Sequence, residues 1–182
     1  MLGHRLDTKI LLVLGSSPII QNQKKCVHKT GLQVQKVVFQ TLADAEVVLS
    51  PEEKDMGAIV INIGSGSTNY IAYAGGAPVH VGGISRGSDL VTSDIAYLFQ
   101  LPKAAAESLK LTDGSCYSPG IDENDMMVTP ALGGKPAIRM PRKEFAKVIE
   151  ARMAEILLMI QQDLQDNQIQ GPFGAGIVLV GG

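Results

Sequence analysis

The chain has 182 residues, of which 45% are hydrophobic, 20 are glycine and only 4% are aromatic. This composition is typical of a globular, turn-rich protein of one domain or two small lobes, and it excludes a fibrous or disordered chain. Sixteen Lys and Arg residues against 18 Asp and Glu residues give a net charge of −2. The charge therefore does not point to a nucleic-acid partner.

The two cysteines, Cys26 and Cys116, lie far apart in the sequence. They form neither a metal-ligand set nor a disulfide framework, so a reducing cytoplasm is the expected compartment. No apolar run approaches the ~18 residues of a membrane-spanning helix, and the run at residues 10–14 is too short for a signal peptide. Because the sequence opens almost directly on a strand-like stretch and stops at Gly182, we expect a fragment of a longer protein.

Residues 1–57 are predicted to alternate between strands and helices. The apolar stretches 7–14 and 34–39 favour strands. Between them, a serine cap, a proline in the first turn and a following Gly31 predict a helix up to about Thr30.

Two short helices are expected next. The first covers residues 42–49. The second begins after Ser50, because Ser50 and Glu53 have the spacing of a capping box, and it ends near Gly57.

Residues 58–73 are the stretch around which the other elements are arranged. The apolar, β-branched and aromatic runs 58–63 and 70–73 favour strands. The turn between them consists of Gly64, Ser65, Gly66, Ser67 and Thr68. Its residues are small enough for their backbone amides to approach an anion closely, as a phosphate-binding loop requires. The same composition also fits an ordinary hairpin.

The remainder is predicted to be mainly helical. A strand over residues 78–84 precedes helices over residues 88–101 and from Pro102 to about Leu111. Residues 126–128 and 137–140 predict a small hairpin around a Gly-Gly pair. A long helix follows over residues 142–166, where apolar residues recur with a period near 3.6.

A last strand is expected at residues 177–180. The whole order of strands and helices indicates an α/β or α+β protein.

Four stretches, in this order, resemble the actin, heat-shock chaperone and sugar-kinase ATPase superfamily. They are residues 61–73, 92–96, 106–110 and 177–182. The resemblance implies the actin-like (ribonuclease H-like) α/β fold.

Within that superfamily the chain resembles most the FtsA family of bacterial division proteins. The residues that carry this resemblance are 3–6, 21–22, 25–27, 31–34, 90–96, 133–136 and 149–156. They extend over essentially the whole chain, which resembles only the middle of such a protein.

The resemblance implies a division of the chain into lobes. Residues 1–57 would be the end of the FtsA-specific inserted subdomain and the return to the first lobe, and residues 58–182 would form the second lobe. Within the second lobe, residues 58–73 are the phosphate hairpin, about 102–171 the outer subdomain, and 177–182 the start of the adenosine loop.

The resemblance also implies that ATP binds with Mg²⁺ between the two lobes. The amides of residues 64–68 would hold phosphate oxygens, and Gly181 and Gly182 would let the backbone lie against adenine. Glu107 and Lys110, three residues apart, share a helix face and would meet the ribose and base. The same spacing fits an ordinary surface ion pair.

Three residues depart from the family pattern. Asn62 and Asn69 stand where the family has aspartates, and Ser65 stands where typical members have glycine. An aspartate would help to hold the metal and order the attacking water, whereas an amide carries no charge and cannot act as a base. We therefore expect weak ATP binding or very slow hydrolysis, and we assign no catalytic residue and no metal ligand from the protein.

The outer subdomain resembles the surface with which FtsA-family members bind the C-terminal peptide of FtsZ. Arg152, Glu155 and Arg142 are the expected contact residues. The nearby Arg139 and Lys143 would suit a carboxylate-bearing peptide. The charges on the long helix also fit an ordinary solvated face.

The resemblance thus implies an adaptor that ties FtsZ to the cytoplasmic face of the membrane at the division septum. Membrane attachment would use a C-terminal helix outside this chain, and self-association into an actin-like polymer is a further expectation. Two alternatives stay open: a PilM-like ATP-binding scaffold of pilus assembly, and an active ATPase or sugar kinase. Asn62 and Asn69 argue against the enzyme.

Overall fold

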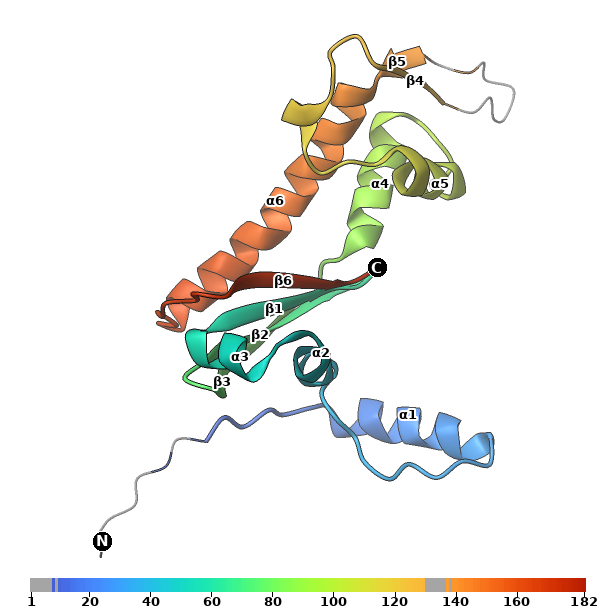
Figure 1. Ribbon diagram of the computed structural model, residues 1–182. Helices are drawn as coiled ribbons and strands as arrows, with labels where there is room; N and C mark the ends of the chain where they lie inside the picture. Colours follow the sequence, from blue (N-terminus) through green and yellow to red (C-terminus); the bar gives the residue numbers. More distant parts are fainter. Residues whose placement is uncertain (1–7, 9, 130–136, 138) are drawn as a thin grey trace, which may run out of the picture. The chain divides into compact units, whose positions relative to one another are not determined.

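The computed structural model describes residues 8, 10–129, 137 and 139–182. Figure 1 labels the elements in chain order: α1 (Ser17–Lys29), α2 (Gln40–Val48), α3 (Pro51–Met56), β1 (Ala58–Ile63), β2 (Thr68–Ala74), β3 (Ala77–Ile84), α4 (Ser88–Leu98), α5 (Lys103–Asp113), η1 (Ser118–Gly120), β4 (Met126–Val128), β5 (Arg139–Pro141), α6 (Arg142–Asp166) and β6 (Gly176–Gly181). Within the described ranges, none of these helices combines the length and apolar character needed to cross a bilayer.

The chain divides into two compact units. Of the described residues, the first contains those within 1–61, 70–81 and 171–178, and the second those within 62–69, 82–170 and 179–182. The lobe boundary expected at Gly57 stays a prediction.

A four-stranded sheet has the strand order β3-β2-β1-β6. The three predicted strands 58–63, 70–73 and 78–84 are confirmed as β1, β2 and β3. Residues Ala58 to Asn62 of β1 are all buried, as expected for a central strand with a nearly continuous apolar run. β6 runs parallel to β1, because Ala175 N donates to Gly57 O (3.0 Å) near one end and Gly182 N donates to Ile63 O (3.3 Å) at the other.

In the first unit, the predicted capping box starts α3. Glu53 N donates to Ser50 Oγ (3.2 Å), and Ser50 N donates to Glu53 Oε2 (2.8 Å). The turn between β2 and β3 is tied to the same helix, since Gly75 N and Gly76 N donate to carbonyls of α3. The helix predicted up to Thr30 is confirmed as α1, although none of its residues is buried.

The strands predicted at residues 7–14 and 34–39 are wrong. Among the described residues, 10–16 and 32–39 contain no strand. A strand needs a neighbour for its backbone groups, and the four-stranded sheet is built entirely from other residues. The apolar side chains of Ile10, Leu12 and Leu14 are accordingly exposed.

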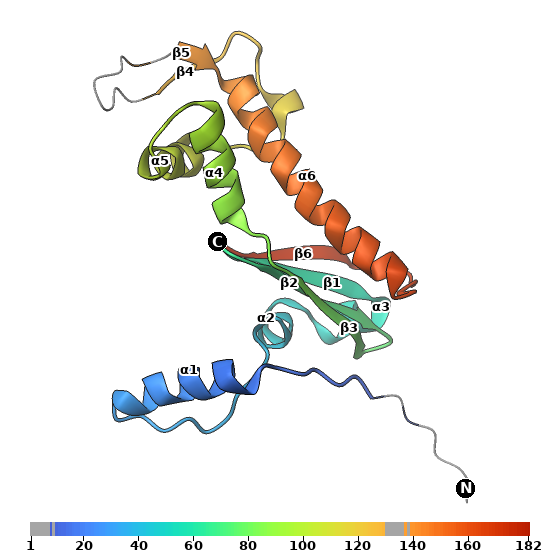
Figure 2. The same ribbon diagram turned by 180° about the vertical axis from the view of Figure 1, so that it is seen from behind.

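The second unit has its core among α4, α5, α6 and the β4–β5 hairpin, and the three helices lie side by side in both views (Figures 1 and 2). The core residues are Val91, Ile95, Ala106, Leu109, Met127, Met140, Phe145 and Ile149. The rings of Phe99 and Phe145 are 5.6 Å apart, centre to centre. α6 has the predicted bounds, whereas α4 ends at Leu98, before the predicted residue 101.

The small hairpin is confirmed by the antiparallel pairing of β4 with β5, in which Met127 lies opposite Met140. The Gly-Gly pair predicted for its tip lies outside the described residues.

Each unit contains one exposed thiol. Cys26 lies on α1 in the first unit, and Cys116 lies just before η1 in the second. Although the residue is exposed, partial burial of its sulfur and then the nearby charge of Glu150 raise the pKa of the Cys116 thiol.

We expect Ile149→Ala to lower the free energy of unfolding of the second unit by about 2–4 kcal/mol, because it leaves a cavity in the core. Leu158→Ala on the same helix is the matched control. Its side chain is 62% exposed, so its effect should stay within about 0.5 kcal/mol. Urea unfolding followed by circular dichroism measures both values. Equal effects of the two substitutions would contradict the assignment of the core.

Candidate functional site

The tip of the β1–β2 hairpin is a short loop in which most backbone N–H groups donate no hydrogen bond to the described part of the protein. One hydrogen bond, from Gly64 N to Ser67 O (2.9 Å), closes it. The amides of Ser65, Gly66 and Ser67 donate none of the hydrogen bonds found among the described residues, and these three residues are exposed. An anion can therefore approach the tip without displacing a bond within the protein.

The hydroxyl of Thr68 is used inside the protein. It donates to the main-chain oxygen of Arg86 (2.9 Å), and Thr68 is completely buried. The bond fixes the base of the tip to the segment between β3 and α4.

The start of α4 is bound directly to the tip. Ser88 N donates to Gly64 O and Asp89 N donates to Ser65 O, each at 2.9 Å. Gly87 precedes the helix, and a Cβ at this position would lie 2.3 Å from Gly64 O. Only glycine therefore lets the helix start approach the tip this closely.

Glu107 and Lys110 belong to a polar cluster between α5 and α4. Lys110 Nζ lies 2.7 Å from Glu107 Oε2 and donates to Thr92 Oγ1 at 2.9 Å. The Thr92 hydroxyl also donates to the Glu107 carboxylate. The hydrogen bond from Lys110, and next that from Thr92, lowers the pKa of Glu107.

Ser88 connects this cluster to the tip. Its amide donates to Gly64 O, and its carbonyl accepts from Lys110 Nζ at 3.5 Å. The predicted phosphate loop and the predicted adenosine residues therefore lie within one hydrogen-bonded neighbourhood.

The glycines at the end of β6 reach the same neighbourhood. Gly181 has φ +108°, and a Cβ there would lie 2.4 Å from Ile63 O. Gly182 N donates to the same oxygen. The tip, the α5 pair and the β6 glycines thus meet at the carboxyl ends of two parallel strands, where open α/β sheets place their ligands.

The two asparagines lie on β1 and β2. Asn62 is 7% exposed. Asn69 Oδ1 occupies space that only a glycine on β3 leaves, since a Cβ at Gly83 would lie 2.7 Å from it. In the described part of the chain, no three His, Cys, Asp or Glu side chains gather closely enough to hold a metal ion.

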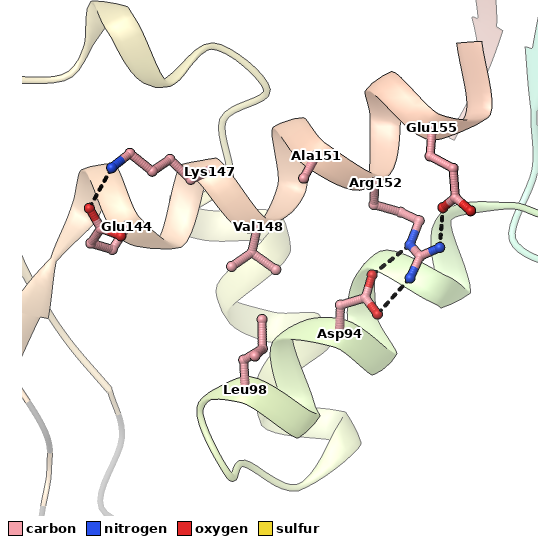
Figure 3. A pocket seen from close by; sticks show the side chains of 8 residues that line it. All are labelled: Asp94, Leu98, Glu144, Lys147, Val148, Ala151, Arg152 and Glu155. Atoms are coloured by element: carbon pink, nitrogen blue, oxygen red, sulfur yellow. Dashed lines mark hydrogen bonds and ion pairs between the residues drawn. The ribbon is translucent and has the colours of Figure 1, made fainter. Parts of the chain in front are cut away.

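A second candidate site is the groove between α4 and α6, with a volume of about 610 Å³ (Figure 3). It is lined by Asp94, Leu98, Glu144, Lys147, Val148, Ala151, Arg152 and Glu155. Its middle is apolar, and each end carries an ion pair (Figure 3). At one end Lys147 Nζ lies 2.7 Å from Glu144 Oε1.

Arg152 holds the other end of the groove. Its Nε and Nη2 donate to the two carboxylate oxygens of Asp94 at 2.6 and 2.9 Å. Its Nη1 donates to Glu155. Asp94, more than Glu155, raises the pKa of the Arg152 guanidinium. A guanidinium has five N–H donors, so Nη1 and Nη2 each retain one N–H beyond these bonds.

Arg142, the third expected contact residue, does not line this groove. Its Nη1 lies 2.6 Å from Asp113 Oδ1 and its Nε lies 3.0 Å from Asp125 Oδ2. The Thr112 hydroxyl, followed by Arg142, lowers the pKa of Asp113. Arg142 therefore ties the start of α6 to the end of α5 and to the loop before β4.

Sequence reasoning missed Ser88, Thr92 and Asp94 as members of these sites. A signal for the first two was present, since residues four apart share a helix face. No signal identified Asp94 as the partner of Arg152, because 58 residues separate them.

Comparison with known proteins identifies the family. The profile of the family "Cell division protein FtsA" matches residues 59–177. FtsA of Borreliella burgdorferi is 36% identical over all of this chain, and FtsA of Escherichia coli K12 is 33% identical over 99% of it. The chain spans 44% of the length of each.

Solved structures share the fold. The crystal structure of MreB5 of Spiroplasma citri bound to ADP has a TM-score of 0.73 at 17% identity, covering 92% of this chain and 54% of that one. The PilM-PilN type IV pilus biogenesis complex has a TM-score of 0.62 at 20% identity, and the match covers 90% of this chain and 40% of that one. The MamK double helical filament has a TM-score of 0.67 at 16% identity, and the match covers 92% of this chain and 53% of that one. The expected resemblance is confirmed: the chain belongs to the FtsA family of cell division proteins and has the actin-like α/β fold.

Proposed function

We propose that the whole protein, of which this chain is a part, is an ATP-binding adaptor that links FtsZ to the cytoplasmic membrane at the division septum. The observation that carries the proposal is the meeting of the hairpin tip, the Lys110 cluster and the β6 glycines around Ile63 and Ser88. Family membership supports a role in cell division.

The nucleotide would bind through its phosphates at the tip. The amides of Ser65, Gly66 and Ser67 are the donors, and the Lys110 ammonium adds positive charge nearby. Gly181 packs closely against Ile63 O without a side chain, and we propose that adenine lies against this backbone. The structure of MreB5 of Spiroplasma citri, which has a similar fold, contains bound ADP. This likeness supports the proposal that a nucleotide binds here.

Mg²⁺ would enter with the phosphates. This ion keeps several waters and takes phosphate oxygens as ligands, so it needs few groups from the protein. When bound it neutralises phosphate charge. The small residues at the tip fit a phosphate, but none of them has a carboxylate that could bind the ion directly.

We propose that hydrolysis is slow because Asn62 and Asn69 provide no base and no anionic metal ligand. This favours a nucleotide-dependent adaptor over an active ATPase or sugar kinase. The match to the FtsA family likewise favours the division protein over a PilM-like pilus scaffold, for which the likeness is one of fold.

The groove between α4 and α6 would take the C-terminal peptide of FtsZ. Its apolar middle, formed by Leu98, Val148 and Ala151, suits an apolar side chain of the peptide. The remaining N–H groups of Arg152 suit a peptide carboxylate, with Glu155 beside them. Arg142 would contribute only through the position of α6.

Membrane attachment and self-association belong to the whole protein. We propose attachment through a C-terminal amphipathic helix outside this chain. The likeness of the fold to the MamK filament supports assembly into an actin-like polymer.

Gly66→Glu should weaken ATP binding by the full-length protein at least about tenfold, because it places a carboxylate against the phosphates. The fold should survive, since a Cβ at Gly66 meets no atom within 4 Å. Titration with a fluorescent ATP analogue measures the affinity. Gln161→Glu, which adds the same charge on the exposed side of α6, is the control. Equal affinity of the Gly66→Glu variant and the unmodified protein would refute the phosphate site.

Asn62→Asp combined with Asn69→Asp should raise ATP turnover by the full-length protein, by about 100-fold if a general base is restored. Phosphate release under saturating ATP and Mg²⁺ measures it. Asn124→Asp, in an exposed loop far along the chain, controls for the added charge. If the unmodified protein already turns over as fast as the double variant, the account of slow hydrolysis fails.

Arg152→Glu should reduce affinity for the FtsZ C-terminal peptide about tenfold or more, because it removes the donors and adds a repelling charge. Lys25→Glu reverses a charge on the exposed face of α1 and should leave affinity unchanged. Fluorescence anisotropy of a labelled peptide gives both values, and circular dichroism verifies the fold. Undiminished binding by a folded Arg152→Glu protein would contradict the assignment of the groove.

A further inference from the structure

Thr92 is a buried polar residue at the centre of the cluster between α4 and α5. It is completely buried, and its hydroxyl has three polar neighbours. The hydroxyl accepts from Lys110 Nζ at 2.9 Å and donates to Glu107 Oε2, and Ser88 O lies 3.3 Å away. A buried hydroxyl that is bonded on both sides fixes the position of the groups around it.

Lys110 has no donor left for a ligand. An ammonium group has three N–H donors. Lys110 Nζ lies 2.7 Å from Glu107 Oε2 and donates to Thr92 Oγ1 at 2.9 Å. The third N–H donates to Ser88 O at 3.5 Å, and the Lys110 side chain is only 15% exposed. Lys110 therefore provides positive charge and holds the cluster together, and it does not donate a hydrogen bond to a nucleotide.

Glu107, by contrast, keeps one carboxylate oxygen available. In the described part of the protein, both of its hydrogen-bonding partners contact Oε2, and its side chain is 41% exposed. The bond from Lys110, and next that from Thr92, lowers the pKa of Glu107. The group is therefore an ionised carboxylate, which only accepts hydrogen bonds. Its Oε1 is left to accept from a hydroxyl of a ligand.

We propose that Thr92 is a positioning residue of the nucleotide site: together with Lys110 it holds Oε2 of Glu107, so that Oε1 keeps one orientation for the ribose hydroxyls. The inference rests on the proposed function, in which ATP binds at the hairpin tip. Ser88 joins the cluster to that tip, because its amide donates to Gly64 O and its carbonyl accepts from Lys110. Without the Thr92 hydroxyl, the partly exposed Glu107 side chain would keep only one of the two contacts that fix it.

A fixed carboxylate distinguishes ligands by their hydroxyl groups. A site built to hydrogen-bond a hydroxyl binds an analogue without it more weakly, because the carboxylate then gives up water and gains no partner. A mobile carboxylate turns to solvent and loses this preference. ATP and 2′-deoxy-ATP differ by one hydroxyl only. The ratio of their affinities therefore reports on Glu107, whereas phosphate binding at the tip contributes equally to both.

The test measures the Kd of ATP and of 2′-deoxy-ATP, each with Mg²⁺, by calorimetry on the full-length protein. The unmodified protein should bind ATP at least about tenfold more tightly than 2′-deoxy-ATP. Thr92→Val keeps the shape of the side chain without its hydroxyl and should reduce this preference to less than about threefold, by weakening ATP binding. Thr92→Ser retains a hydroxyl and should restore most of the preference. A role in stability alone would weaken the binding of both nucleotides equally.

Thr112→Val is the control. It makes the same substitution on α5, where the exposed hydroxyl donates to Ser108 O at 3.1 Å, and it should keep the full preference for ATP. Glu107→Gln tests the carboxylate itself. Because the position is partly exposed, the fold should survive, and the preference should fall as it does in Thr92→Val.

Circular dichroism verifies the fold of every variant, and Thr92→Ala replaces Thr92→Val if the valine variant does not fold. Equal affinity of the unmodified protein for ATP and 2′-deoxy-ATP would overturn the inference alone. The full preference retained by a folded Thr92→Val or Thr92→Ala protein would overturn the role of Thr92, and the same result for Glu107→Gln would overturn that of Glu107. Failure of the unmodified protein to bind ATP would overturn the proposed function together with the inference.

Discussion

The second unit depends on the attachment of a helix start to a hairpin tip. Two backbone hydrogen bonds, from Ser88 to Gly64 and from Asp89 to Ser65, make this attachment. The donors are amides of the kind that every helix leaves unpaired in its first turn, and the acceptors are carbonyls of the hairpin turn. The cost is that residue 87 must be glycine. The benefit is that the tip, which has no regular structure of its own, is held by a helix packed in the core.

The elements that could be predicted correctly are those that a local sequence pattern specifies. α6 has its predicted bounds because 25 residues of periodic sequence leave little ambiguity, and α3 begins where its capping box begins. The strands predicted at residues 7–14 and 34–39 failed for the opposite reason. A β-strand is completed by a neighbour, and neither apolar composition nor β-branching shows whether a neighbour is present.

The same distinction applies to the sites. The glycine and hydroxyl tip, the Glu107–Lys110 spacing and the final glycines were predictable because each is a short stretch of sequence. Their meeting through Ser88 and Ile63 was not predictable from local pattern, nor was the pairing of Asp94 with Arg152 across 58 residues. Arg142 stays a prediction as a contact residue. Its sequence neighbourhood suggested a contact with a partner, whereas its guanidinium is bonded to Asp113 and Asp125.

The two thiols have a practical consequence. Cys26 and Cys116 lie on different units. Because thiolate is the nucleophile, the raised pKa of Cys116 slows its reaction with a maleimide dye near neutral pH. Raising the pH should speed the labelling of Cys116. The two cysteines of this chain thus offer one fluorophore position on each unit for energy-transfer measurements in solution.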